Sequence, residues 1–174
     1  MITHDGYVKL IDFGIARRLA CETATTASQL AFTLVGTPEY VAPEVLLGQG
    51  YGASADFWSL GILMFEMFCG FTPFADEEDL EEDAIYMRII QEDLSVHLEC
   101  LDGDLRDVVT QLLERDTDLR IGCRHSSHNQ DSILELMHHP FFANVDWQGT
   151  LHGKLDEDTL FVKPGKRVQA VLDK

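Results

Sequence analysis

The stretch Asp56 to Gly70, DFWSLGILMFEMFCG, decides how the rest of this chain folds. Its strongly polar residues after the first are Ser59 and Glu66 alone, and apolar side chains at helical spacing cover nearly every face. A helix that is apolar all round is either a membrane span or the central helix of a soluble core. The stretch is shorter than the roughly 20 apolar residues that a bilayer needs, and Pro73 follows closely. The sequence therefore predicts a buried central helix, here called the hub helix.

The two ends of the hub helix carry different signals. Asp56 or Ser54 is the expected N-cap, because a short polar side chain accepts hydrogen bonds from the free N–H groups of a first helical turn. Gly70 is the expected exit, because glycine adopts the left-handed conformation in which many helices end.

Length, composition and net charge limit the number of domains and the kinds of partner that this chain can have. A chain of 174 residues with 45% hydrophobic residues is one domain, or part of a larger one, and can bury a core. Its 30 acidic and 13 basic residues give a net charge of −17. This charge disfavours binding to nucleic acid or to anionic lipid. It is compatible either with an ordinary soluble acidic surface or with attraction for basic peptides.

Cysteine usage indicates a reducing compartment, the cytoplasm or the nucleus. The four cysteines are widely scattered and form no C-x-x-C motif: Cys21, Cys69, Cys100 and Cys123. Cys123-x-His125-x-x-His128 could suggest a metal site, but it lies among polar residues without a fourth ligand, which favours a surface loop. The polar residues after Met1 do not resemble a signal peptide.

Periodicity predicts the other elements. Residues 1–11 suggest a β-hairpin with an Asp5-Gly6 turn, and a strand starting at residue 1 suggests that sequence is missing upstream. Helices are expected over 84–91 and 132–138, and past Phe142 the chain is expected to be irregular. The clearest helix has one apolar stripe made by Leu105, Val108, Val109, Leu112 and Leu113. The acidic run 76–83 is either the solvated start of a helix or an attractor of basic partners.

Several short motifs occur along the chain, and their order is informative. Asp12-Phe13-Gly14 follows an apolar strand, Ala42-Pro43-Glu44 ends a Thr-rich loop, and the hub helix follows. Arg115-Asp116-x-x-x-Arg120-Ile121-Gly122 and His139-Pro140-Phe141-Phe142 complete the set. Each motif alone recurs by chance, but the ordered set resembles the C-terminal lobe of a protein kinase over almost the whole chain. GTPEYVAPE (36–44), DFWSLGIL (56–63) and Asp146-Trp147 look most like the AGC group of serine/threonine kinases.

The resemblance implies a fold and a domain division. The fold would be mostly α with a small β-hairpin, a protein-kinase-like C-terminal lobe. Residues 1–142 would be a partial kinase domain. Residues 143–174, which include DTLFVKP, would be the truncated start of the AGC-type C-terminal extension.

The same resemblance implies a nucleotide role for the first motif. Asp12 would hold the Mg²⁺ that bridges the phosphates of ATP, because a hard cation prefers carboxylate oxygen. The alternative is an aspartate that merely ends a strand. Phe13 would pack inward and set the position of Asp12, and Gly14 would supply backbone freedom for that movement.

The loop and the segment after it would regulate the enzyme and bind its substrate. Thr33 matches an activation-loop site for an upstream activating kinase, the alternative being an ordinary loop threonine. Thr37 would hydrogen-bond the catalytic aspartate. The pocket for the residue after the phosphate acceptor would be lined by Leu34, Pro38 and Val41.

Three charged residues complete the implied set. Glu66 is the one carboxylate inside the hub helix, where it would pair either with an arginine of a basic substrate or with an internal donor. Glu44 and Arg120 would form a buried ion pair that anchors the loop to the lobe. Asp12 and the segment ending at Glu44 would both lie over the hub helix.

The sequence also lacks parts that phosphoryl transfer needs. It contains no Gly-rich phosphate loop, and no His-Arg-Asp motif precedes Asp12. The chain alone is therefore expected to be inactive. Three interpretations stay open: a serine/threonine kinase acting on basic peptides that has lost its N-terminal half, a genuine short product that binds basic partners without catalysis, or an unrelated acidic helical domain.

Overall fold

The computed structural model describes residues 1, 8–17, 36–75, 81–124 and 129–151, with backbone only for residues 129–132 and 151. The chain divides into two units, each described by itself. One unit combines Met1–Ala16 with Asn144–Lys174, and the other is Arg17–Ala143. The described part is mostly helical, as the sequence predicts.

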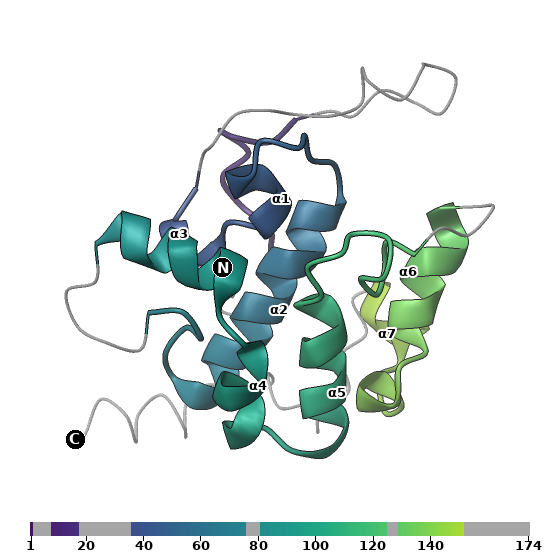
Figure 1. Cartoon of the computed structure of the whole chain (residues 1–174). Helices are drawn as coiled ribbons and strands as arrows, with labels where there is room; N and C mark the ends of the chain where they lie inside the picture. The colour runs from purple at the N-terminus through teal and green to yellow at the C-terminus, as the bar shows by residue number, and fades with distance from the viewer. Residues whose placement is uncertain (2–7, 18–35, 76–80, 125–128, 152–174) are drawn as a thin grey trace, which may run out of the picture. The chain divides into compact units, whose positions relative to one another are not determined.

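The core of the larger unit forms where α2 (Ser54–Cys69) lies alongside α5 (Gly103–Leu112) (Figure 1). Gly61 lets the two helices approach closely, because a Cβ at this position would lie 2.8 Å from Leu113 Cδ2 and 2.9 Å from Leu112 Cβ. The buried apolar side chains that α2 and α5 supply are Trp58, Ile62, Phe65, Val108, Val109 and Leu112. This stripe on α5 is the one that its periodicity predicts.

Short helices complete the core around this pair. On one side lie α3 (Glu82–Gln91), α4 (Leu94–His97) and the 3₁₀ turn η3 (Leu98–Cys100). They bury the side chains of Ile85, Ile89 and Leu98. Arg115 holds the C-terminal end of α3 in place, because its guanidinium donates hydrogen bonds to the carbonyl oxygens of Ile89 and Glu92.

The remaining elements of this unit are η2 (Pro38–Tyr40), α1 (Pro43–Leu46), α6 (Asn129–Met137) and η4 (Pro140–Phe142). His139 joins η4 to α5. Its Nδ1 accepts a hydrogen bond from the Phe141 N–H at 3.2 Å, and its Nε2 lies 3.0 Å from Asp107 Oδ2. The histidine of the His-Pro-Phe-Phe motif therefore has a packing role that can be read from its contacts.

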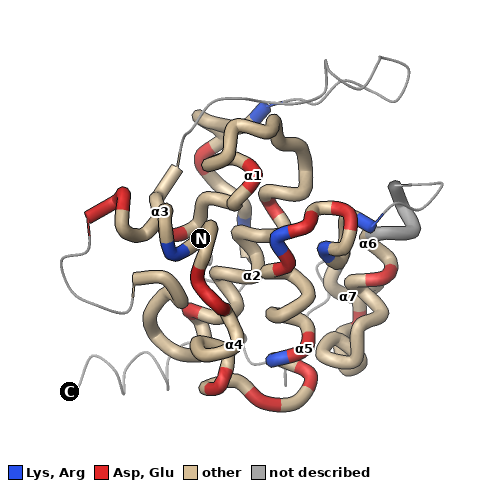
Figure 2. Tube along the Cα trace, in the orientation of Figure 1, with Lys and Arg blue, Asp and Glu red and all other residues tan. Residues whose placement is uncertain are grey.

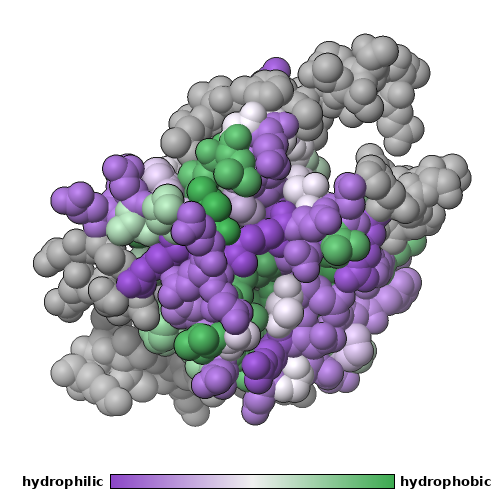
Figure 3. All heavy atoms as spheres, viewed as in Figure 1, coloured by the Kyte–Doolittle hydropathy of each residue, from purple (hydrophilic) through white to green (hydrophobic). Residues whose placement is uncertain are grey.

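The hub helix differs from its prediction in one respect. It is buried along a single stripe, whereas Leu63, Met67 and Phe68 are 42%, 70% and 58% exposed. The prediction of a buried central helix is therefore confirmed along that stripe only, and within the described residues no packed element covers the other three side chains. On the face of the molecule shown in Figure 3, hydrophobic side chains likewise remain visible among hydrophilic ones.

The helix ends confirm one prediction and correct another. Gly70 has φ 85° and its N–H donates to the Glu66 carbonyl, so the left-handed exit is confirmed. The N-cap is Ala53, and among the described residues no side chain caps the helix. The expected capping by Asp56 or Ser54 was wrong because the helix starts at Ser54, which places Asp56 inside the first turn. In that position the negative charge of Asp56 is stabilised by the positive end of the helix dipole.

Several boundaries shift from their predicted places. The helix expected over 84–91 begins at Glu82, and the one expected at residue 132 begins at Asn129. The chain is not wholly irregular past Phe142, since α7 (Trp147–Leu151) forms in the smaller unit, with Asp146 Oδ1 accepting from the Gly149 N–H.

The predicted hairpin is described only at its base. There the Lys9 N–H donates to the Met1 carbonyl oxygen at 2.8 Å, and the Met1 ammonium donates to the Lys9 carbonyl oxygen at 2.9 Å. The expected Asp5-Gly6 turn lies outside the described residues. A separate expectation concerned membranes: within the described ranges, no helix combines the length and apolar character of a membrane span.

Candidate functional site

The segment Gly36–Glu44 lies against α2 through η2, and it contains the start of a second short helix, α1. Proline begins both of them, at Pro38 and Pro43, where its fixed φ suits a helix start and its missing N–H costs nothing. The Ser59 hydroxyl of α2 donates to the Tyr40 carbonyl at 2.9 Å. The segment is thereby attached to α2.

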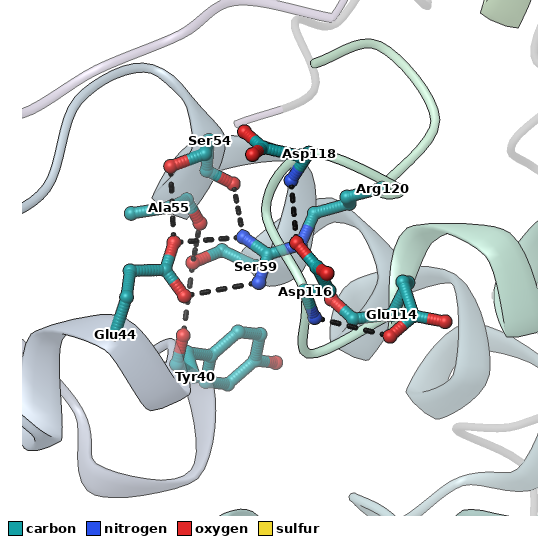
Figure 4. A network of polar contacts seen from close by, with 9 residues as sticks. All are labelled: Tyr40, Glu44, Ser54, Ala55, Ser59, Glu114, Asp116, Asp118 and Arg120. Atoms are coloured by element: carbon teal, nitrogen blue, oxygen red, sulfur yellow. Dashed lines mark hydrogen bonds and ion pairs between the residues drawn. The ribbon is translucent and has the colours of Figure 1, made fainter. Parts of the chain in front are cut away.

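A buried ion pair fixes the end of this segment (Figure 4). Arg120 Nη1 lies 2.8 Å from Glu44 Oε1 and Nη2 lies 2.9 Å from Oε2, which is a two-pronged pairing. Glu44 is 4% exposed and Arg120 is fully buried. The pair expected between these two residues is thus present in the structure.

The other polar groups around the pair satisfy its remaining hydrogen-bonding capacity. Arg120 donates to the carbonyl oxygens of Glu114 and Ser54, each at 2.8 Å. The Ser54 hydroxyl donates to Glu44 Oε1 at 3.0 Å. The guanidinium also lies over the Trp58 ring, 5.3 Å from its centroid. A buried charge pair is tolerable only when its groups are satisfied in this way.

Glu66 faces the same segment one helical turn before the end of α2. The Tyr40 hydroxyl donates a hydrogen bond to Glu66 Oε2. Burial, and then this contact with Glu66, raises the pKa of Tyr40 to about 12, so the phenol keeps its proton and remains a donor. Glu66 is only partly buried, which leaves it able to accept a second donor. Of the two partners expected for Glu66, the internal one is present.

Negative charge gathers around Tyr86 of α3. Burial raises the pKa of Tyr86, and the carboxylates of Glu82, Asp83 and Glu39 raise it further. Each of these three acids therefore lies within electrostatic range of Tyr86, on α3, which packs on η2. Figure 2 shows acidic positions outnumbering basic ones along the described trace. The acidic run expected at 76–83 contributes here through Glu82 and Asp83, while residues 76–80 lie outside the described part.

The Asp12-Phe13-Gly14 motif belongs to the smaller unit. Asp12 is exposed and has a positive φ of 60°, and its Oδ1 accepts a hydrogen bond from the Gly14 N–H at 3.1 Å. Phe13 is 67% exposed, so it does not pack inward as expected, because no described side chain covers its ring. The expected proximity of Asp12 to the segment ending at Glu44 stays a prediction.

The Asp12 carboxylate can form part of a magnesium site. Mg²⁺ is usually held by one or two carboxylates, with phosphate oxygens and water completing its shell. The Asp12 carboxylate is open to solvent and can supply one such ligand. No group of three or more potential metal-ligating side chains occurs within the described ranges.

The remaining predicted site residues have mixed outcomes. Thr33 and Leu34 lie outside the described residues. Thr37 is exposed, Pro38 is half-buried and Val41 is 6% exposed, so Val41 offers little surface to a ligand. Their expected roles stay predictions.

Sequence reasoning missed three side chains that the structure places in this network, Tyr40, Ser54 and Ser59. The tyrosine lies within the GTPEY motif, and the two serines lie at the start of the hub helix on the side that faces Glu44 and Tyr40. The sequence held one indication of the role of Tyr40. A carboxylate inside an apolar helix, such as Glu66, requires a hydrogen-bond donor from a neighbouring element.

Comparisons with known proteins agree with this arrangement. The family model for the protein kinase domain matches residues 1–142. The chain is 38% identical over 157 residues to the human cAMP-dependent protein kinase catalytic subunit PRKX, covering 89% of the chain and 38% of that protein. It is 36% identical over 157 residues to the serine/threonine protein kinase ypkA of Aspergillus fumigatus, covering 90% of the chain and 22% of that protein. It is 33% identical over 156 residues to mouse protein kinase C eta type, covering 90% of the chain and 21% of that protein.

The chain thus spans between about a fifth and two fifths of the length of these curated relatives. The expected resemblance to AGC-type kinases is confirmed, and the described helices agree with a kinase C-terminal lobe.

Proposed function

The chain belongs to the protein kinase family, and from this premise we propose that it forms the peptide-binding lobe of an AGC-type serine/threonine kinase that uses ATP and Mg²⁺. The observation that carries this proposal is the attachment of the segment Gly36–Glu44 at two places: Tyr40 bonds Glu66 of α2, and Glu44 forms a buried pair with Arg120, which follows α5. Such an attachment keeps an irregular segment in one conformation, as a peptide-binding surface requires.

Glu66 is the proposed contact for a basic substrate. The Tyr40 hydroxyl orients its carboxylate, and the side chain is only partly buried, so an arginine guanidinium can donate to it. Glu39 adds negative potential at Tyr40, and Glu82 and Asp83 add it at Tyr86, which favours the approach of a positively charged peptide. Pro38, Val41 and Leu34 are proposed to border the position of the residue after the phosphate acceptor.

The nucleotide side of the site rests on Asp12. When bound, Mg²⁺ would neutralise charge on the transferring phosphoryl group, and the exposed Asp12 carboxylate would be its protein ligand here. Thr37 is proposed to hydrogen-bond a catalytic aspartate, and Thr33 to accept regulatory phosphate from an upstream kinase. Residues 143–174 are proposed to begin the C-terminal extension.

Replacing Glu66 with glutamine tests the peptide contact. The change keeps the shape and a carbonyl acceptor for Tyr40 but removes the charge. Affinity for an arginine-containing fluorescent peptide should fall by about tenfold, because hydrogen bonds to charged groups contribute roughly 1.5–3 kcal/mol. Fluorescence anisotropy at fixed ionic strength measures the dissociation constant.

Glu99 in η3 provides the matched control. It is exposed, and Glu99→Gln removes the same charge from a side chain on η3 instead of one on α2. Equal losses for the two variants would show that only net charge matters, and would contradict a specific contact at Glu66.

The 174 residues by themselves should show no phosphoryl transfer. Positioning and charge stabilisation supply nearly all of kinase catalysis, and the sequence contains neither a Gly-rich phosphate loop nor a His-Arg-Asp motif. Incubation of the purified chain with radiolabelled Mg-ATP and basic peptides should give incorporation at the level of a no-enzyme control. Robust turnover that is lost in Asp12→Asn would overturn this expectation.

A binding module without catalysis is the second candidate. The net charge of −17 and the accessible Glu66 favour it, because neither depends on nucleotide. Peptide affinity that persists without ATP and Mg²⁺ and is weakened by Glu66→Gln would support this function for the chain as it stands. Absence of any peptide binding would count against both candidates.

A further inference from the structure

Two cysteines far apart in the sequence meet at one end of the hub helix. Cys69 is the last residue of α2, and Cys100 is the last residue of η3, 31 positions later. Their Sγ atoms are 2.7 Å apart, and both are free thiols. A disulfide requires a sulfur–sulfur distance of about 2.05 Å, so closing the bond needs only small side-chain rotations.

The surroundings hold both sulfurs in place. Cys100 Sγ also donates to the His97 carbonyl oxygen at 3.2 Å. The residues beside it, Leu98 and Leu101, are 3% and 2% exposed, so η3 is fixed in the core. The proximity of the two thiols therefore follows from packed elements and not from a chance approach of two loops.

The two thiols differ in their access to solvent. Cys100 is exposed, whereas Cys69 is partly buried. Burial, and then the hydrogen bond with Cys100, raises the pKa of Cys69 to about 12. Cys69 thus keeps its proton at neutral pH, and Cys100 is the sulfur that a dissolved oxidant reaches first.

We propose that Cys69 and Cys100 form a dithiol site that a hydroperoxide converts reversibly into an intramolecular disulfide. In the first step the Cys100 thiolate attacks one peroxide oxygen, the O–O bond breaks, and the leaving oxygen departs as water or alcohol after protonation. In the second step Cys69 sulfur attacks the Cys100 sulfenic acid, and the hydroxyl leaves as water with the Cys69 proton. The dithiol loses two protons and two electrons in total, and the peroxide gains them.

The bond would act on the end of α2. It would join the last turn of the hub helix to η3 and close the intervening residues into a loop, which restricts the unfolded chain. Glu66 lies three residues before Cys69, so oxidation would also limit fraying of the turn that carries this carboxylate. Reversibility agrees with a reducing compartment, where disulfides are usually transient and redox-sensing. The proposal does not depend on the kinase function.

The test uses the full chain with Cys21→Ser and Cys123→Ser, which removes the other two thiols. After reduction and removal of the reductant, hydrogen peroxide is added in small molar excess. Intact mass should fall by two hydrogens, and digestion should yield one linked peptide pair containing Cys69 and Cys100. The melting temperature should rise by about 10 °C and return on addition of dithiothreitol.

Two comparisons keep the test decisive. Cys100→Ser, at an exposed position, should fold normally and should lose both the linked peptide and the temperature shift. The unsubstituted chain should give the same linked pair, so the result does not depend on the variants folding. Oxidation of Cys100 to sulfinic acid without a linked peptide, or linkage through Cys21 or Cys123 in the unsubstituted chain, would overturn the proposal.

Discussion

Replacing Arg120 with methionine is expected to lower the free energy of unfolding by about 3–5 kcal/mol. Methionine fills much of the space but leaves the carboxylate of Glu44, which is 4% exposed, without its partner. The carbonyl oxygens of Glu114 and Ser54 also lose their donor. Such a loss is a large part of the stability of an ordinary domain, and should lower the melting temperature by roughly 10 °C. Urea denaturation followed by circular dichroism measures it.

Two further variants separate the stranded charge from the loss of an arginine. Arg106 is exposed on α5, and Arg106→Met should change stability by less than about 0.5 kcal/mol. Arg120→Met combined with Glu44→Leu should recover a large part of the loss, because the uncompensated charge is then gone. If Arg120→Met costs no more than Arg106→Met, the pair does not anchor the segment.

Features that depend on local pattern could be predicted from the sequence. The stripe on α5 follows from apolar residues at helical spacing, and all but its first member are buried. Gly70 follows from the need for a left-handed residue at a helix end. The pairing of Glu44 with Arg120 came from resemblance to a family, since nothing local links residues that lie 76 positions apart.

Features that depend on which surfaces meet could not be predicted. The composition of the hub helix shows that it is apolar, but it does not show which of its faces are covered. The meeting of Cys69 with Cys100 follows from the way η3 packs, and no spacing rule reports it. The cap expected at Asp56 failed because the helix starts earlier than its apolar run, at a residue whose hydroxyl binds Glu44 instead.

The second large expected loss of stability comes from replacing a phenylalanine of α2, and a second phenylalanine on the same helix serves for comparison. Phe65 is fully buried, and its ring contacts Phe71 edge to face with centroids 5.8 Å apart. Phe65→Ala removes this contact and leaves a cavity in the core, so the free energy of unfolding should fall by about 3–5 kcal/mol. Phe68 lies three residues further on and is 58% exposed. Phe68→Ala should cost less than about 1 kcal/mol, since little apolar surface returns to water. Thermal and urea melts of both variants measure the difference.

The pair of variants distinguishes a helix buried on one stripe from a helix buried all round, because the substitution is chemically identical at both positions. A large, equal loss for both would mean that Phe68 is covered in solution, for example by a second copy of the chain. In that case the loss at Phe68 should depend on protein concentration, whereas the loss at Phe65 should not. A small loss at Phe65 would contradict the packing of α2 on α5, and with it the support for the segment that carries Tyr40 and Glu44.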